Sequence, residues 1–68
     1  MQLHQILMLI PSCIPIIVFD SANIEICRVY SKDEINIDLY EYDIATIYPA
    51  KIKFDYDVKT GIVINIYK

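Results

Sequence analysis

The chain has 68 residues, of which 56% are hydrophobic, and a formal net charge of −3 at pH 7. A chain of this length forms one small domain and has little interior to spare for a deep active-site cleft. The negative charge argues against direct nucleic-acid binding, which needs clustered Lys and Arg side chains. We therefore predict a single domain over residues 1–68 that does not bind nucleic acid directly.

Residues 1–19 contain no Asp, Glu, Lys or Arg, whereas residues 20–68 are acidic and rich in strand-forming residues. Apolar residues at i, i+3, i+4 and i+7 near the start mark one face of a short helix: Leu3, Ile6, Leu7 and Ile10. Pro11 is expected to stop this helix, and residues 14–19 are expected to form a buried strand. We therefore predict that residues 1–19 belong to the core.

Two alternatives remain open for residues 1–19. A secretory signal peptide has a basic region before its apolar stretch, whereas here Pro11 and Pro15 interrupt the run and no Lys or Arg precedes it. A transmembrane helix needs about 20 apolar residues, and His4 and the two prolines dilute this segment. We favour a cytoplasmic location. The alternative is a membrane-attached or secreted factor that uses residues 1–19 as anchor or signal.

Strand signals follow in chain order after the uncharged segment. Polar residues at 20–23 predict a turn, and the Ile, Val and Tyr content of residues 24–30 predicts a strand. Polar residues at 31–34 predict a second turn. Over residues 35–39 apolar and polar side chains alternate, which is typical of a half-buried strand.

The alternation changes phase at Leu39–Tyr40, because the next apolar positions are Tyr40, Tyr42 and Ile44. A shift of one residue turns the side chains of a strand to its opposite face. We therefore expect a β-bulge at this point, and the alternative is a strand covered on both faces. The strand signal continues over residues 44–48, and Pro49 is expected to end it.

The clearest predicted element is a C-terminal β-hairpin. Apolar and charged residues alternate over residues 51–57, and isoleucine occupies every second position over residues 62–67, on either side of Val58–Gly61. Gly61 is the only glycine, and a hairpin loop of this length favours glycine at a positive φ. The expected fold is mostly β, of the α+β class: a small antiparallel sheet of four or five strands with a short N-terminal helix and this hairpin.

The sequence contains no motif that specifies a reaction, a metal or a cofactor. Cys13 and Cys27 do not have the spacing of a zinc site, and we expect two free, buried thiols, with a disulfide as the alternative. His4 is the only histidine, and no acidic residue lies near it in the sequence. We therefore expect a non-enzymatic protein without metal or cofactor.

Tyrosines interspersed with acidic residues are the remaining functional signal, and they are densest between residues 38 and 43. Tyrosine is enriched at protein interfaces because it combines apolar area with a hydroxyl group, although it also favours strands. An acidic, aromatic face suits a basic protein surface. The predicted function is thus binding of a protein partner, or self-association, and the candidate partner-binding residues are Asp38, Tyr40, Glu41, Tyr42 and Asp43.

Overall fold

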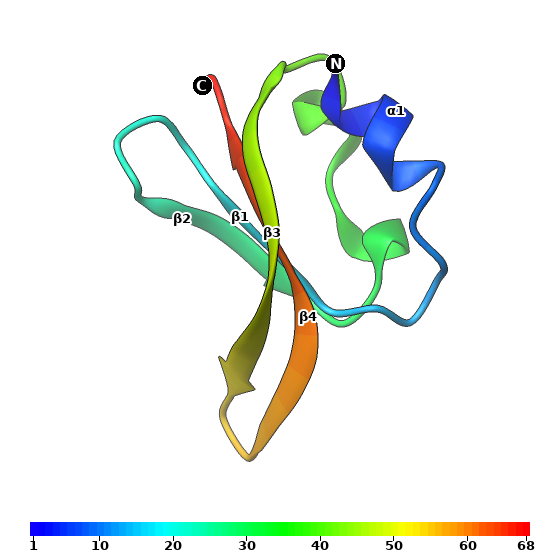
Figure 1. The fold of residues 1–68 in the computed structure, drawn as a ribbon, viewed down its shortest axis with the longest axis vertical. Coiled ribbons are helices and arrows are strands. Elements are labelled where there is room, and N and C mark those ends of the chain that lie inside the picture. The colour runs from blue at the N-terminus through cyan, green and yellow to red at the C-terminus, as the bar shows by residue number, and fades with distance from the viewer.

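The computed structural model describes residues 1–68 and contains a four-stranded sheet in the order β2-β1-β4-β3 (Figure 1). The apolar, β-branched runs form its strands, which are β1 (Ile16–Phe19), β2 (Glu25–Val29), β3 (Ile44–Phe54) and β4 (Asp57–Ile66). One short helix, α1 (Leu3–Leu7), precedes them. The prediction of a mostly β fold with a short N-terminal helix and a C-terminal hairpin is confirmed.

The sheet is mixed rather than wholly antiparallel, because β1 pairs in parallel with β4. The pairs β1–β2 and β3–β4 are antiparallel. The chain leaves β2 and crosses the length of the sheet before β3 begins (Figure 1). Such a crossover is what a parallel pair requires, and it brings β4 back in the same direction as β1.

The crossover holds two short 3₁₀ helices, η1 (Lys32–Glu34) and η2 (Ile37–Leu39), and no strand. The expected strand over residues 35–39 and the expected bulge at Leu39–Tyr40 are therefore wrong. The Asn36 side chain accepts a hydrogen bond from the backbone N–H of Asp38 at 2.9 Å and caps η2. Ile35 and Leu39 are buried while Ile37 is 71% exposed, so the buried spacing is i, i+4 rather than i, i+2.

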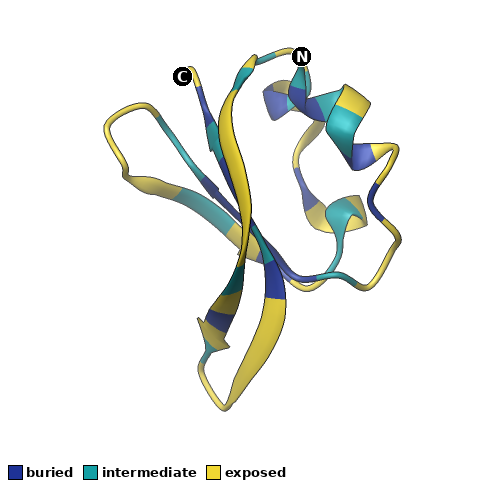
Figure 2. Ribbon diagram, viewed as in Figure 1, coloured by how far each residue is buried: buried dark blue, intermediate teal, exposed yellow.

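The main core lies between the sheet and the layer formed by α1, η1 and η2 (Figure 2). The uncharged N-terminal segment contributes buried side chains from both α1 and β1. Strand β4, which lies next to β1 in the sheet, contributes further buried side chains. The buried side chains of this cluster are Leu3, Leu7, Ile10, Ile16, Val18, Val29, Ile35, Leu39, Ile64 and Ile66. No helix of the structure is long and apolar enough to span a membrane.

The hairpin is tighter than the sequence indicates. Phe54 pairs with Asp57, so the turn is formed by Asp55 and Tyr56, and residues 58–61 lie within β4. Gly61 pairs with Ala50 and has no positive φ, so its expected place in the turn is wrong. Its lack of a side chain serves a close approach instead, because the carbonyl group of Pro15 lies against its Cα.

Both outer strands of the sheet have an irregular register. In β2 the extra residue is Ile26, and this bulge brings Glu25 and Arg28 to one face, where they form an ion pair at 2.6 Å. In β3 the extra residue is Ala45. Strand β3 also continues through Pro49, which was expected to end it, because an outer strand tolerates the missing N–H of proline.

Candidate functional site

The predicted partner-binding segment, residues 38–43, lies beside the beginning of the chain and is fixed there by backbone hydrogen bonds. The N–H groups of Leu3 and His4 donate to the carbonyl oxygens of Tyr42 and Tyr40 at 2.9 and 3.0 Å. On the other side, the Tyr67 N–H donates to the Asp43 carbonyl at 2.9 Å. The segment is therefore held from both sides although it belongs to no strand.

The two tyrosines of this segment are partly used by the fold. Tyr40 and Tyr42 are half-buried and pack against the main core. The aromatic share of the predicted face is thus smaller than the sequence indicates, because both side chains are partly covered by the core.

The three carboxylates of the segment have a different environment. Asp38, Glu41 and Asp43 are exposed, and their side chains form no hydrogen bond or ion pair. Apart from Asp55, every other carboxylate of the chain accepts a hydrogen bond or pairs with a cation. These engaged carboxylates are Asp20, Glu25, Asp33, Glu34 and Asp57. Unpaired negative charge is therefore concentrated on the predicted face.

A hollow of about 480 Å³ opens beside this face, between β2 and η2. Asp38 and Tyr42 both line it, so two of the predicted partner-binding residues share this hollow. The sequence interpretation missed the rest of the lining. The full lining consists of Ile26, Cys27, Glu34, Asn36, Asp38, Leu39, Tyr42 and Lys68.

Glu34 reaches the hollow because a capping interaction shapes η1. Its carboxylate oxygen Oε2 accepts hydrogen bonds from the backbone N–H groups of Tyr30 and Ser31, at 3.1 and 3.0 Å. The Ser31-x-x-Glu34 spacing is a recognisable capping signal and could have identified this turn from the sequence. No sequence pattern indicates that Lys68 lines the hollow, because its position depends on the tertiary fold.

Lys68 is fixed in the hollow at two points. Its backbone oxygen accepts a hydrogen bond from the hydroxyl group of Ser21 at 2.7 Å. Its ammonium nitrogen lies 5.7 Å from the centroid of the Tyr42 ring, within the range of a cation–π interaction. No carboxylate forms an ion pair with it.

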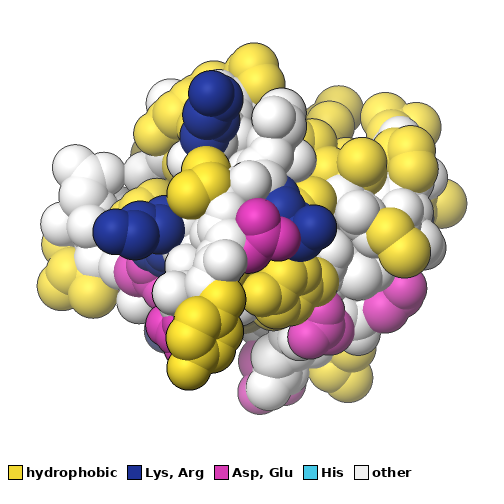
Figure 3. Space-filling view, turned by 90° about the horizontal axis from the view of Figure 1, so that it is seen from below, with side chains coloured by type: hydrophobic (Ala, Val, Ile, Leu, Met, Phe, Trp, Pro, Cys, Tyr) yellow, Lys and Arg dark blue, Asp and Glu magenta, His cyan; other side chains and the backbone are white.

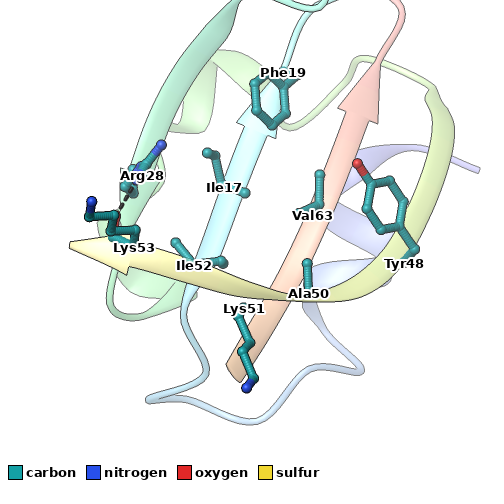
Figure 4. A pocket seen from close by; sticks show the side chains of 9 residues that line it. All are labelled: Ile17, Phe19, Arg28, Tyr48, Ala50, Lys51, Ile52, Lys53 and Val63. Atoms are coloured by element: carbon teal, nitrogen blue, oxygen red, sulfur yellow. Dashed lines mark hydrogen bonds between the residues drawn. The ribbon is translucent and has the colours of Figure 1, made fainter. Parts of the chain in front are cut away.

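A second hollow, of about 300 Å³, lies on the opposite face of the sheet, where β3 curves across β1 and β4 (Figure 4). Ile17, Ile52 and Val63 form its buried floor, while Lys51 points away from it. The guanidinium group of Arg28 donates to the Lys53 carbonyl oxygen and closes one end. Arg28, one of the three cationic residues that line this hollow with Lys51 and Lys53, is therefore already engaged within the chain.

The hairpin end of the molecule shows no large patch of one kind. Apolar side chains and charges of both signs are interspersed there (Figure 3). The Tyr30 and Phe54 rings stack at 4.0 Å and join the end of β3 to the end of β2. This aromatic pair thus stabilises the curvature of the hairpin rather than presenting an isolated ring to solvent.

The two cysteines are free, but only one of them is shielded. Cys13 is exposed, which corrects the expectation of two buried thiols, because it lies in the loop between α1 and β1 with a φ of 70°. Cys27 is half-buried, and this burial raises the pKa of its thiol, with a smaller contribution from the charge of Glu25. A hydrogen bond with the Val18 backbone opposes the rise in the pKa.

We expect iodoacetamide at about pH 8 to modify Cys13 at least about tenfold faster than Cys27, because the thiolate is the reactive form. Burial and the raised pKa both reduce the reactive fraction of Cys27. Mass spectrometry of peptides sampled over time measures the two rates, and in denaturant they should become equal. Equal rates in the folded protein would contradict the described environment of Cys27.

His4 contacts neither a carboxylate nor a thiol. Its Nε2 atom forms a hydrogen bond with the Gln2 side-chain oxygen at 2.8 Å. No group of three or more His, Cys, Asp or Glu side chains is arranged to hold a metal ion. His4, Cys13 and Cys27 are thus not assembled into such a group.

No family model matches this chain, and neither a curated protein nor a solved structure is similar to it. We therefore infer function from the contacts and charges of the chain itself.

Proposed function

We propose that this protein is a small, non-enzymatic interaction module that binds a basic protein partner through residues 38–43. The supporting observation is the set of three exposed carboxylates, of Asp38, Glu41 and Asp43, that have no partner within the chain. A carboxylate without an internal partner is available to an external cation, whereas an engaged one must first give up its contacts.

The fixed backbone of this segment favours such binding. Hydrogen bonds from Leu3, His4 and Tyr67 already hold its carbonyl groups, so little conformational entropy remains to be lost when a partner docks. Exposed charges of one sign also attract an oppositely charged surface over distances up to the screening length of about 8–10 Å. The face therefore combines long-range attraction with a preformed shape.

The proposal predicts that Asp38→Asn with Glu41→Gln slows partner association by roughly tenfold, because charges at the rim of an interface act mainly on the association rate. Partners are first captured on the immobilised wild-type protein from an extract of its native source. Surface plasmon resonance then gives the association rate of each captured protein. Raising the salt concentration from low to physiological should slow wild-type association as well.

Asp55→Asn with Asp57→Asn is the matched control, since it removes the same charge from the hairpin turn and the first residue of β4. This control should associate at nearly the wild-type rate. If every captured protein binds the Asp38/Glu41 variant as fast as the wild type and is indifferent to salt, residues 38–43 are not the binding face.

A further inference from the structure

The hollow beside the acidic face already contains a cation that belongs to the chain. The ammonium group of Lys68 lies over the Tyr42 ring, and both residues line the hollow together with Asp38. The face of an aromatic ring attracts cations electrostatically, and tyrosine is among the better rings for this contact. The structure thus shows which kind of group this hollow accepts.

The contact between this ammonium group and the Tyr42 ring is weak, so another cation can replace Lys68 there. Lys68 forms no ion pair, and its backbone is fixed separately through the Ser21 hydroxyl group. Its side chain can therefore leave the Tyr42 ring without disturbing the strand that precedes it. The hollow also has room beyond the lysine, since it offers about 480 Å³ between η2 and β2.

Two acceptors on the wall of the hollow suit an ammonium group supplied by another protein. The Asp38 carboxylate has no partner. The Glu34 carboxylate uses only its Oε2 atom in the hydrogen bonds that cap η1, which leaves Oε1 unoccupied. An ammonium group has three donors and no acceptor, so these oxygens add acceptors for it on the wall of the hollow.

We propose that this hollow binds a lysine side chain of the partner protein, whose ammonium group displaces Lys68 from the Tyr42 ring. The inference rests on the proposed function, because the hollow adjoins the same acidic face. Lys68 then acts as an internal competitor: it occupies the cation position in the free protein and leaves when the partner docks.

The probe for this site is a nine-residue peptide of alternating glycine and lysine, with an otherwise identical peptide of glycine and glutamine as its control. Both are titrated into the ¹⁵N-labelled full chain at low salt. The lysine peptide should shift the amide signals of Asn36, Asp38 and Tyr42, and the glutamine peptide should not. Lys68→Gln should tighten lysine-peptide binding about twofold to fivefold, the range that a cation–π contact at an exposed site supplies.

Lys51→Gln is the matched control, because it removes the same charge from the exposed surface of β3. It should tighten binding less than Lys68→Gln does. Tyr42→Phe keeps the aromatic face and should bind like the wild type, whereas in a Tyr42→Leu background Lys68→Gln should tighten binding no more than Lys51→Gln does, because the ring for which the two lysines compete is gone. Amide dispersion of the Leu variant checks that it is folded, and the Lys68 comparison in the wild-type chain does not depend on it.

The outcomes separate this site from the proposed function. If the lysine peptide does not bind, or if Lys68→Gln and Lys51→Gln have equal effects, the lysine site is overturned. If partner association is also unaffected by Asp38→Asn with Glu41→Gln, the proposed acidic face is wrong as well. If that double substitution slows partner association while Lys68→Gln tightens lysine-peptide binding no more than Lys51→Gln does, the acidic face stands and the lysine site alone is wrong.

Discussion

A chain that begins at Asn23 is expected to be unfolded and to give a poorly dispersed amide NMR spectrum. Nearly half of the buried hydrophobic side chains lie in residues 1–19, namely Leu3, Leu7, Ile10, Ile16, Ile17 and Val18. The deletion also removes β1, which pairs with β2 on one side and β4 on the other. The remaining residues 23–68 are then near the size below which a chain needs disulfides, metals or oligomerisation to fold.

Two substitutions in the full chain distinguish lost packing from a general effect of truncation. Leu3 is fully buried, and Leu3→Ala should lower the free energy of unfolding by about 2–5 kcal/mol. Met8 is 76% exposed just after α1, and Met8→Ala should change it by no more than about 0.5 kcal/mol. A well-dispersed, monomeric spectrum of residues 23–68 would show instead that the N-terminal segment is dispensable for folding.

Gly61→Ala is expected to lower the free energy of unfolding by about 3 kcal/mol, toward the upper end of what overpacking in a tight site costs. A Cβ atom at this position would overlap the backbone carbonyl oxygen of Pro15 and lie 2.8 Å from Cδ1 of Ile52. The Pro15 oxygen cannot simply move aside, because it accepts the backbone hydrogen bond of Ile62 that begins the parallel pairing of β1 with β4.

Chemical denaturation of the variant and the wild type measures this difference. Thr60→Ala is the control, because Thr60 is the exposed neighbour of Gly61 on the same strand. It should shift the denaturation midpoint much less. An unchanged midpoint for Gly61→Ala would mean that β1 and β4 approach each other less closely than the structure describes.

The role of Gly61 illustrates where sequence interpretation succeeds and where it fails. Alternation predicted both strands of the hairpin, but the only glycine of the chain was assigned to the turn because turns favour glycine. The glycine is needed where Pro15, from a distant part of the chain, approaches β4. Only the parallel pairing of β1 with β4 creates that requirement, and no local pattern reports such a pairing.

The N-terminal helix was predictable because its apolar residues are periodic. Strands β1 and β2 were predictable because their runs of apolar, β-branched residues are bounded by polar or proline residues. The crossover was not, because Ile35, Ile37 and Leu39 alternate with polar residues as a strand would. The Asn36 side chain decides the conformation by capping η2. Short polar side chains that bond to nearby backbone groups compete with strand formation in this way.

The candidate site was predictable only in part. Charge and tyrosine content identified residues 38–43, and the carboxylates there are exposed. The hollow could not be predicted, because Glu34, Cys27 and Lys68 reach it from three separate elements. Its cation, Lys68, is placed by the end of β4 and by a hydrogen bond from Ser21, both of which are long-range features.

The irregular outer strands affect how readily copies of the protein can aggregate through their sheet edges. A flat outer strand offers a row of unpaired N–H and C=O groups on which further chains can stack into fibres. Here Ile26 and Ala45 interrupt that row on the two sides, and Pro49 removes a donor from β3. A chain that is 56% hydrophobic therefore offers no regular edge for polymerisation.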